Sequence, residues 1–296
     1  MADAGTAVRK SPRGKAAPDA AGRVVVFFDL DDTLIDVNSG WLWVRHEVAL
    51  GRISVVRLPP FLWHTSGSCT FGSCYLSPSS LPSHPPCVQG LVLRAVYYMI
   101  IYALGWVKNV DSAYKTAVST YAGIPVATIR SQTQKWFKEE VLPRTRPLAR
   151  TVLERHRKQG DLCVLASSTT QFAAECAVTA YGLDDTVSSV LEVDANGALT
   201  GNVEKLAFGR SKLIRVREWA AARNVDLSRA WFYSDSIADA PLLAEVGNPV
   251  CVNPDRRLRR LARHKGWPVV DWGHSPAPLI KRVSSSNLIG QDKSAS

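Results

Sequence analysis

The stretch "VVVFFDLDDTLID", residues 24–36, sets five apolar residues directly before a cluster of acids. An apolar run of this length predicts a buried strand. Asp29, Asp31 and Asp32 follow it within four positions, where their like charges repel one another. Because side chains alternate along an extended chain, Asp29 and Asp31 are expected on the same side. Two such carboxylates at the end of a buried strand need a cation between them, or a proton on one of them.

Short apolar runs alternate with helical patterns over much of the chain, which is typical of an open parallel sheet with helices on both faces. Further strands are predicted at 161–166, 230–234 and 249–252, after a first strand at 23–28. Helical patterns precede two of them, at 146–160 and 211–224. Asn196-Gly197, between two alternating segments, predicts a hairpin turn. The expected fold class is α/β, a Rossmann-like, doubly wound and mostly parallel sheet.

A long helical region separates the first two predicted strands, which indicates a helical cap domain inserted into the sheet domain. A disordered basic tail is expected over 1–22 and a loose C-terminal tail over 275–296. The core is expected in two pieces, 23–37 and 146–274, with the cap between them at 38–145. Within the cap, 90–107 is strongly apolar. Arg94 and Lys108 are closer together than the ~20 uncharged residues that cross a bilayer require, which favours a buried or interfacial helix.

Residues 58–89 break the helical pattern of the cap, because Ser, Pro and Gly dominate there. This segment holds five residues of types that can bind zinc, namely His64, Cys69, Cys74, His84 and Cys87. Their spacing matches no closed structural zinc site, where paired ligands sit close together. We therefore expect a flexible insertion, with a zinc site as the less favoured alternative.

The charge of the chain narrows the class of its partners. A net charge of +10 over 296 residues favours anionic partners, and much of the excess lies in "DRRLRRLARHK", residues 255–265. Aromatic residues are not interleaved with these cations, so no nucleic acid is expected as a partner. A weak contact of this helix with an anionic membrane surface is a further hypothesis. Six irregularly spaced cysteines without a secretory signal indicate reduced thiols and a cytoplasmic protein.

A second acidic pair repeats the design of the first. In "WFYSDSIADAPLL", residues 231–243, an apolar strand is followed by Asp235 and then by Asp239. On a helix, residues four positions apart share one face. Open α/β sheets bind ligands at the carboxyl ends of their strands, so both acidic pairs are expected at one edge. An oxygen-rich site of this kind suits a hard divalent ion such as Mg²⁺.

These motifs resemble the haloacid dehalogenase superfamily. "DLDDT" is similar to its first motif, Asp-x-Asp-x-Thr, and "LASSTT" (165–170) resembles the second motif, best at Ser167. Lys212, in "GRSKLIRV", suits the basic residue of the third motif. "SDSIAD" is similar to the fourth, with Asp235 and Asp239 as its acids. The order and strand context of the motifs agree over the two pieces of the expected core.

The helical insertion between the first two motifs implies subfamily IB, the branch with a helical cap that contains phosphoserine phosphatases. Two departures from those enzymes stand out. Ser168-Thr169 replaces a Gly-Gly pair in the second motif, and Ser234 and Ala238 replace a Gly and an Asn in the fourth. Phosphoserine is therefore not expected as the preferred substrate.

The resemblance implies a role for each motif residue. Asp29 would attack phosphorus and form an aspartyl-phosphate, while Asp31 would protonate the leaving oxygen and then activate water. Phosphate binding is assigned to Thr33, Ser167 and Lys212. The Mg²⁺ ligands would be Asp29, Asp31 through its main-chain carbonyl, and Asp235, supported by Asp239.

The expected function is a Mg²⁺-dependent phosphatase that acts on a small phosphorylated metabolite. Two alternatives stay open, a phosphoryl transferase and a non-catalytic anion-binding or membrane-binding protein on the same fold. The presence of both Asp29 and Asp31 favours an enzyme, because binding alone needs no acid/base carboxylate. The oligomeric state is left open.

Overall fold

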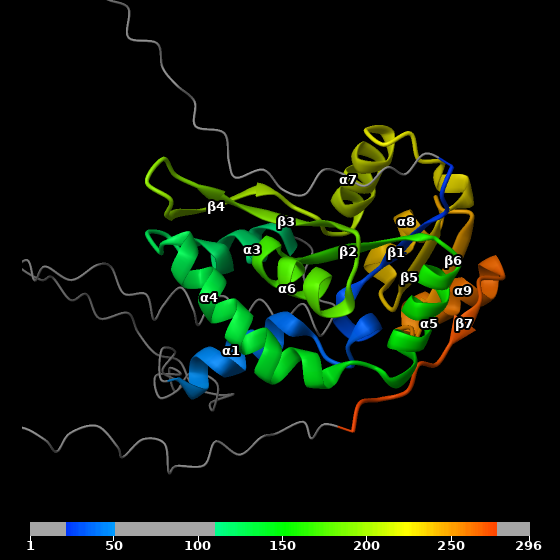
Figure 1. The fold of residues 1–296 in the computed structure, drawn as a ribbon, viewed down its shortest axis with the longest axis horizontal. Helices are drawn as coiled ribbons and strands as arrows, with labels where there is room; N and C mark the ends of the chain where they lie inside the picture. Colours follow the sequence, from blue (N-terminus) through cyan, green and yellow to red (C-terminus); the bar gives the residue numbers. More distant parts are fainter. Residues whose placement is uncertain (1–21, 51–109, 277–296) are drawn as a thin grey trace, which may run out of the picture. The chain divides into compact units, whose positions relative to one another are not determined.

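The computed structural model describes residues 22–50 and 110–276 of the chain (Figure 1). The described residues form two compact units. Unit 1 holds 22–36, 146–189 and 207–274, and unit 2 holds 37–50, 110–145, 190–206 and 275–276. The predicted insertion at 58–89, the apolar segment at 90–107 and most of both predicted tails lie outside the described residues.

Seven strands of the described residues form one sheet, in the order β4-β3-β2-β1-β5-β6-β7. They are β1 (Val25–Phe28), β2 (Leu162–Thr170), β3 (Asp185–Val193), β4 (Leu199–Lys205), β5 (Trp231–Ser234), β6 (Asn248–Val252) and β7 (Val269–Val270). Neighbouring strands are parallel except for the β3–β4 pair. The predicted α/β class with a mostly parallel sheet is confirmed, whereas the short strand β7 was not predicted.

Helices cover both faces of the sheet in unit 1. They are α5 (Pro147–Lys158), α6 (Gln171–Tyr181), α7 (Arg210–Ala221), α8 (Ala240–Leu243) and α9 (Arg256–Lys265). Side chains of β1 alternate between the two faces of the sheet. Val25 and Phe27 join a buried cluster with apolar residues of α7, α8 and α9. Phe28 points the other way, with its ring centroid 6.1 Å from that of His156 in α5. Short runs of valine and phenylalanine form the centre of the sheet because both faces are buried.

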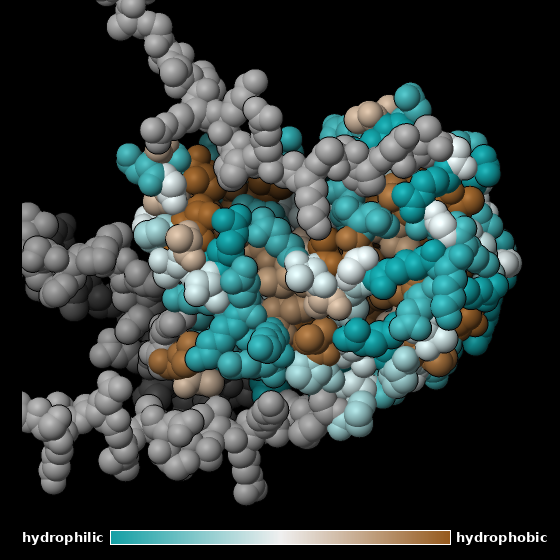
Figure 2. Space-filling model, viewed as in Figure 1, coloured by the Kyte–Doolittle hydropathy of each residue, from teal (hydrophilic) through white to brown (hydrophobic). Residues whose placement is uncertain are grey.

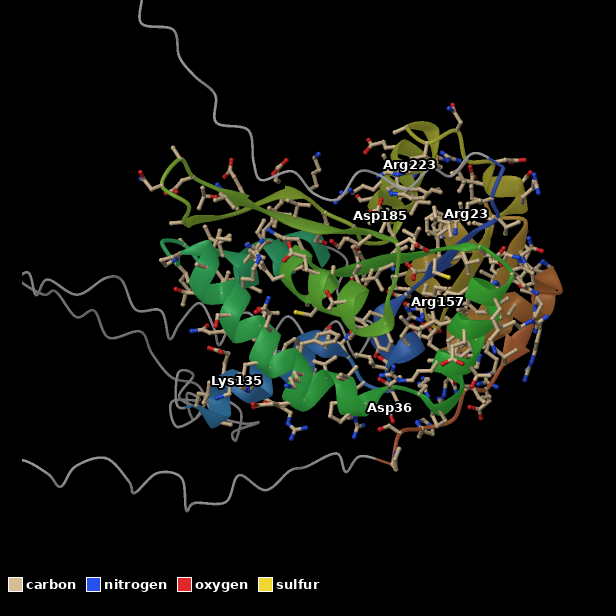
Figure 3. All side chains as sticks on the ribbon, in the orientation of Figure 1. Arg23, Asp36, Lys135, Arg157, Asp185 and Arg223 are labelled. Atoms are coloured by element: carbon tan, nitrogen blue, oxygen red, sulfur yellow. The ribbon has the colours of Figure 1, made fainter. Side chains whose placement is uncertain are left out.

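Asp185, the first residue of β3, anchors this strand to α7. Its carboxylate accepts hydrogen bonds from Arg223 Nη2 and Trp219 Nε1, both at 2.8 Å. Figure 3 labels Asp185 and Arg223, whose side chains lie close together where α7 approaches β3. The Arg223 guanidinium also lies 4.5 Å from the centroid of the Trp219 ring. These contacts fix β3 against the helix that carries Lys212.

Unit 2 contains the described helices α1 (Ser39–Ala49), α3 (Val110–Ser119) and α4 (Val126–Trp136), with the turns η4 (Phe137–Val141) and η5 (Leu142–Arg144). Trp43 and Trp136 pack edge to face, with centroids 5.0 Å apart. The second half of β3 pairs antiparallel with β4, and Gly197 takes a φ of 80° in the turn between them. The predicted hairpin at Asn196-Gly197 is thus confirmed. The helical cap over 38–145 falls largely outside the described residues and stays a prediction.

Candidate active site

Strand register in unit 1 brings the predicted motifs to one edge of the sheet. Phe28 at the end of β1 lies opposite Leu165 of β2 and Tyr233 of β5. Asp29, the next residue, donates its backbone N–H to the carbonyl of Tyr233 at 3.0 Å. Because all three strands are parallel, Asp29 and Asp235, which directly follow β1 and β5, lie with Ser167 of β2 toward the same carboxyl edge, where open α/β sheets bind ligands.

The segment after β1 turns tightly enough to return its acids to this edge. Asp29 caps the turn, since its Oδ1 accepts from Leu30 N at 2.8 Å. Asp32 has a φ of 52°, a left-handed conformation that non-glycine residues adopt rarely and Asp adopts more readily. Arg146 holds this turn, because its Nε and Nη2 donate to the carbonyl of Asp32 at 3.2 and 3.1 Å. Another N–H of Arg146 donates to the carbonyl of Gly273.

Lys212 is the cation at the centre of the site. It lies in the first turn of α7 and is only 3% exposed. Its Nζ donates to Asp239 Oδ2 at 2.8 Å and lies 3.4 Å from Asp29 Oδ1. The Ser234 hydroxyl also donates to Asp239 Oδ2, at 2.7 Å. Asp239 therefore holds Lys212 in place, and the same ammonium lies close to Asp29.

Burial and mutual repulsion set the acidity of these groups. Burial raises the pKa of Asp29 to about 8; Lys212 lowers that pKa, and Asp239 and Asp31 raise it. Burial raises the pKa of Asp235 well above its ordinary value, as does the neighbouring carboxylate of Asp29. Burial alone would lower the pKa of Lys212, but Asp239 and Asp29 hold it above its ordinary value. One lysine is thus shared among several carboxyl groups, and the raised pKa values mean that the site favours binding of protons or of a further cation.

The remaining predicted residues differ in how closely they join this network. Thr33 is fully buried, and its hydroxyl lies 3.4 Å from Asp235 Oδ1, which links the first motif to the fourth. Asp31 is half-buried and near enough to raise the pKa of Asp29. Ser167 is fully buried, and its Oγ accepts from Thr169 N at 3.4 Å. No contact joins Ser167 to the acids among the described residues.

The donor set at this edge fits a magnesium ion in its chemistry. Within the described residues, no three side chains of His, Cys, Asp or Glu converge as a complete ligand set. Asp29 nevertheless raises the pKa of Asp235, as a neighbouring carboxylate does where no cation lies between the two. Mg²⁺ commonly takes only one or two protein carboxylates and keeps several waters. Asp239 is already engaged by Lys212 and Ser234, so a supporting role suits it better than direct ligation.

Sequence reasoning missed Asp255, which holds the loop that carries Asp235. Its Oδ2 accepts from Ile237 N at 2.7 Å, and its backbone N–H donates to the carbonyl of Asp235 at 2.9 Å. Its Oδ1 caps α9 by accepting from Arg257 N and Leu258 N at 2.7 and 2.8 Å. An Asp directly before a helical run is an N-cap signal, although in this sequence the basic run that follows Asp255 obscures it.

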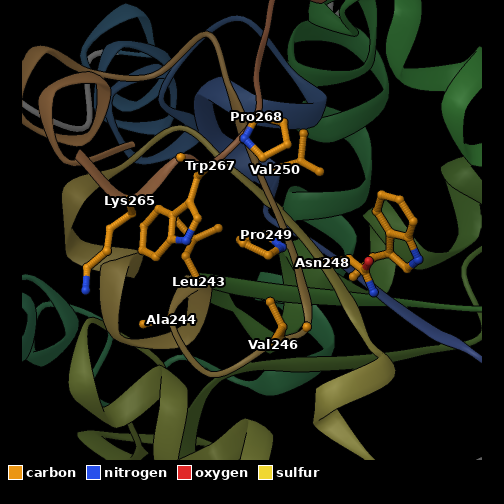
Figure 4. A pocket seen from close by; sticks show the side chains of 12 residues that line it. Leu243, Ala244, Val246, Asn248, Pro249, Val250, Lys265, Trp267 and Pro268 are labelled. Atoms are coloured by element: carbon orange, nitrogen blue, oxygen red, sulfur yellow. The ribbon is translucent and has the colours of Figure 1, made fainter. Parts of the chain in front are cut away.

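A pocket of about 470 Å³ lies away from these acids (Figure 4). It is lined by Trp231 and Asn248, the first residues of β5 and β6, and by Trp267 before β7. These positions belong to the amino ends of the strands, the opposite edge from Asp29. The pocket is therefore distinct from the candidate active site.

Comparisons with known proteins identify a family for this chain. The family model described as haloacid dehalogenase-like hydrolase matches residues 81–244, more than half of the chain. The match includes Ser167, Lys212, Asp235 and Asp239 and begins after Asp29.

Two relatives and one solved structure extend the comparison. The "inhibition of morphological differentiation protein" of Streptomyces azureus is 33% identical over 196 residues, 65% of this chain and 70% of the relative. A histidinol-phosphatase of Neisseria meningitidis is 30% identical over 168 residues, 55% of this chain and 76% of the relative. The phospho-aspartyl intermediate analogue of a phosphoserine phosphatase is 14% identical with a TM-score of 0.53, covering 86% of this chain and 95% of that one, and so shares its fold. The chain belongs to the haloacid dehalogenase-like hydrolases.

Proposed function

We propose that the protein is a Mg²⁺-dependent phosphatase that hydrolyses a small phosphate monoester through an aspartyl-phosphate on Asp29. The observation that carries the proposal is the buried contact of Lys212 with both Asp29 and Asp239, at the carboxyl edge of the sheet. A buried carboxylate beside a buried cation is arranged for reaction with an anion, because the cation offsets the repulsion between the two negative charges. Family membership supports the same reaction class.

In this mechanism Asp29 attacks phosphorus, so that an Asp29 O–P bond forms and the bond to the leaving alcohol oxygen breaks. Asp31, protonated at the start, gives its proton to that oxygen. Water then attacks the aspartyl-phosphate, Asp31 takes a proton from the water, and the Asp29 O–P bond breaks. Lys212, Ser167 and Thr33 are proposed to bind phosphate oxygens. A bound Mg²⁺, held by Asp29, the Asp31 carbonyl and Asp235, would neutralise charge on the phosphoryl group.

Phosphate release from a panel of monoesters, with and without Mg²⁺, tests the proposal. The panel should contain an aryl phosphate, histidinol phosphate, phosphoserine and sugar phosphates. We expect turnover that requires Mg²⁺ and that does not rank phosphoserine first, because Ser168-Thr169 stands where phosphoserine phosphatases have Gly-Gly. Trapping of a phosphorylated Asp29, seen by mass spectrometry, would support the covalent route. Full turnover after exhaustive chelation would contradict the proposed Mg²⁺ requirement.

The alternative of a phosphoryl transferase shares every step up to the aspartyl-phosphate. Adding glycerol or ethanol to the same assay distinguishes the two, because a transferase gives phosphorylated alcohol in place of inorganic phosphate. We expect inorganic phosphate as the main product at all alcohol concentrations. No turnover of any monoester would favour the second alternative, a non-catalytic anion-binding protein.

A further inference from the structure

Helix α9 presents a cationic surface that the catalytic site does not use. Its ten residues contain six cations and no acid, namely Arg256, Arg257, Arg259, Arg260, Arg263 and Lys265. All six are exposed. Within the described residues, none of their side chains takes part in an ion pair or a hydrogen bond, although exposed arginines elsewhere do, as Arg217 does with Glu245. We call these six residues the α9 face.

The fold itself does not need this charge. Leu258 and Ala262 are the residues that bury α9 against the sheet, and Asp255 and Gly266 end the helix on either side. The cations stand three and four residues apart on one helix, where like charges destabilise the helix. Asp255, the N-cap of α9, makes no ion pair with them; its two oxygens accept from Ile237 N and from the backbone of the first turn of α9. The α9 face is thus a repulsive cluster held on a helix that other residues secure.

Apolar groups lie beside these cations. The chain leaves α9 through Trp267 and Pro268 into β7, the last strand of the sheet, where Val269 is 41% exposed. Trp267 packs partly on the core and lines the pocket of Figure 4, where the labelled Lys265 and Trp267 lie at one end. In Figure 1 α9 (orange) lies at the right-hand edge of the view, and Figure 2 shows mainly hydrophilic residues along that edge.

We infer that the α9 face, with Trp267 and Val269 at its end, docks on an anionic lipid surface. Clustered arginines and lysines are attracted to the negative potential of such a surface, and a neighbouring Trp suits the headgroup boundary. A nucleic-acid site would instead interleave aromatic side chains with the cations for base stacking, and α9 contains none. The inference is independent of the phosphatase reaction, because none of these residues belongs to the candidate active site.

Sedimentation of the full chain with vesicles tests the inference. One vesicle is pure phosphatidylcholine, and the other contains phosphatidylglycerol in addition. We expect binding to the anionic vesicle only, weakening steeply between low and high salt. Each cation at such a surface contributes roughly a fivefold factor, so replacing Arg259, Arg260 and Arg263 by Gln should weaken binding by about 100-fold. These three lie away from Asp255 and its loop.

A matched control removes the same charge elsewhere. Lys115, Lys135 and Lys138 are exposed cations of unit 2, and their triple change to Gln should leave vesicle binding within about twofold of the wild type. Thermal melts of both triple variants should not fall below that of the wild type, since all six positions are exposed and the α9 changes remove repulsion between like charges. Equal loss in the two variants, equal binding to both vesicles, or tighter binding to duplex DNA than to anionic vesicles would each overturn the inference.

Discussion

Lys212 is the residue on which the electrostatics of the site depend. A buried ammonium needs compensation, and Asp239 supplies it at 2.8 Å with Ser234 steadying the carboxylate. Asp29, at 3.4 Å from the same ammonium, is left partly uncompensated, and burial raises its pKa to about 8. A carboxylate in that condition attracts any further cation that reaches it. Lys212 therefore compensates the charge of Asp29 only in part, so that a metal ion can still bind there.

Replacement of Asp29 by Asn should abolish turnover of every monoester while leaving the fold intact. The amide removes the attacking oxygen, and a neutral group of the same shape is well tolerated where burial already disfavours the charged form. Steady-state hydrolysis of an aryl phosphate and a thermal melt provide the two measurements. A variant that hydrolyses the ester at near wild-type rate would refute the covalent route.

Replacement of Lys212 by Met should lower kcat by about 10²- to 10³-fold, the usual effect of removing one group that stabilises charge in the transition state. The apolar side chain keeps much of the volume of the lysine beside Phe232. Lys205, which is exposed, provides the control, and its change to Met should leave kcat unchanged. Equal rates for the two variants would exclude a role for Lys212 in the reaction.

The candidate site residues lie at or near the ends of short strands and helices. The aliphatic runs predicted β1, β5 and β6 within about two residues, because buried parallel strands are nearly continuous in apolar residues. β2 continues through Ser167 to Thr170, beyond the predicted end, since its polar residues pair with β3 as far as Thr170. β7 has only two residues and leaves no detectable pattern.

The candidate site, too, could be predicted from the sequence only in part. Its motif residues could be named from the spacing of the acids and from the family resemblance. The pairing of Lys212 with Asp239 could not, because it joins residues 27 positions apart through the packing of α7 on the sheet. Arg146, whose side chain holds the carbonyl of Asp32, looked in the sequence like the start of a helix.

Asp255 ties the start of α9 to the loop that carries Asp235. Asp255→Ala should destabilise the protein by about 1–2 kcal/mol through loss of the cap. It should also raise the Mg²⁺ concentration for half-maximal activity, since Ile237 N loses the carboxylate that positions the loop.

The control for Asp255 is Asp226, which caps the short turn η6 (Leu227–Arg229) by accepting from Ser228 N. Asp226→Ala removes a cap without touching the loop of Asp235, so its Mg²⁺ requirement should stay that of the wild type. A shift of the same size in both variants would show that Asp255 acts through general stability alone.

At the scale of the whole molecule, the described site residues all belong to unit 1, although they come from segments far apart in the sequence. None of the candidate site residues lies within 58–89 or 90–107. Among the described residues, no helix has the length and apolar character needed to cross a membrane. The chemistry of the site therefore rests on the sheet and its helices, and folding of unit 1 brings together carboxylates that repel one another.

Metal binding should consequently stabilise the folded chain. Folding places Asp29 and Asp235 together, where burial raises the pKa of each, so a cation that binds only the folded site shifts the equilibrium toward it. At 100 times its Kd, Mg²⁺ should add about 2.7 kcal/mol to the free energy of unfolding. A thermal melt with and without Mg²⁺ measures this as a rise of several degrees. Asp235→Ala should lose the rise, whereas Asp226→Ala should keep it, and an equal rise in both would place the ion elsewhere.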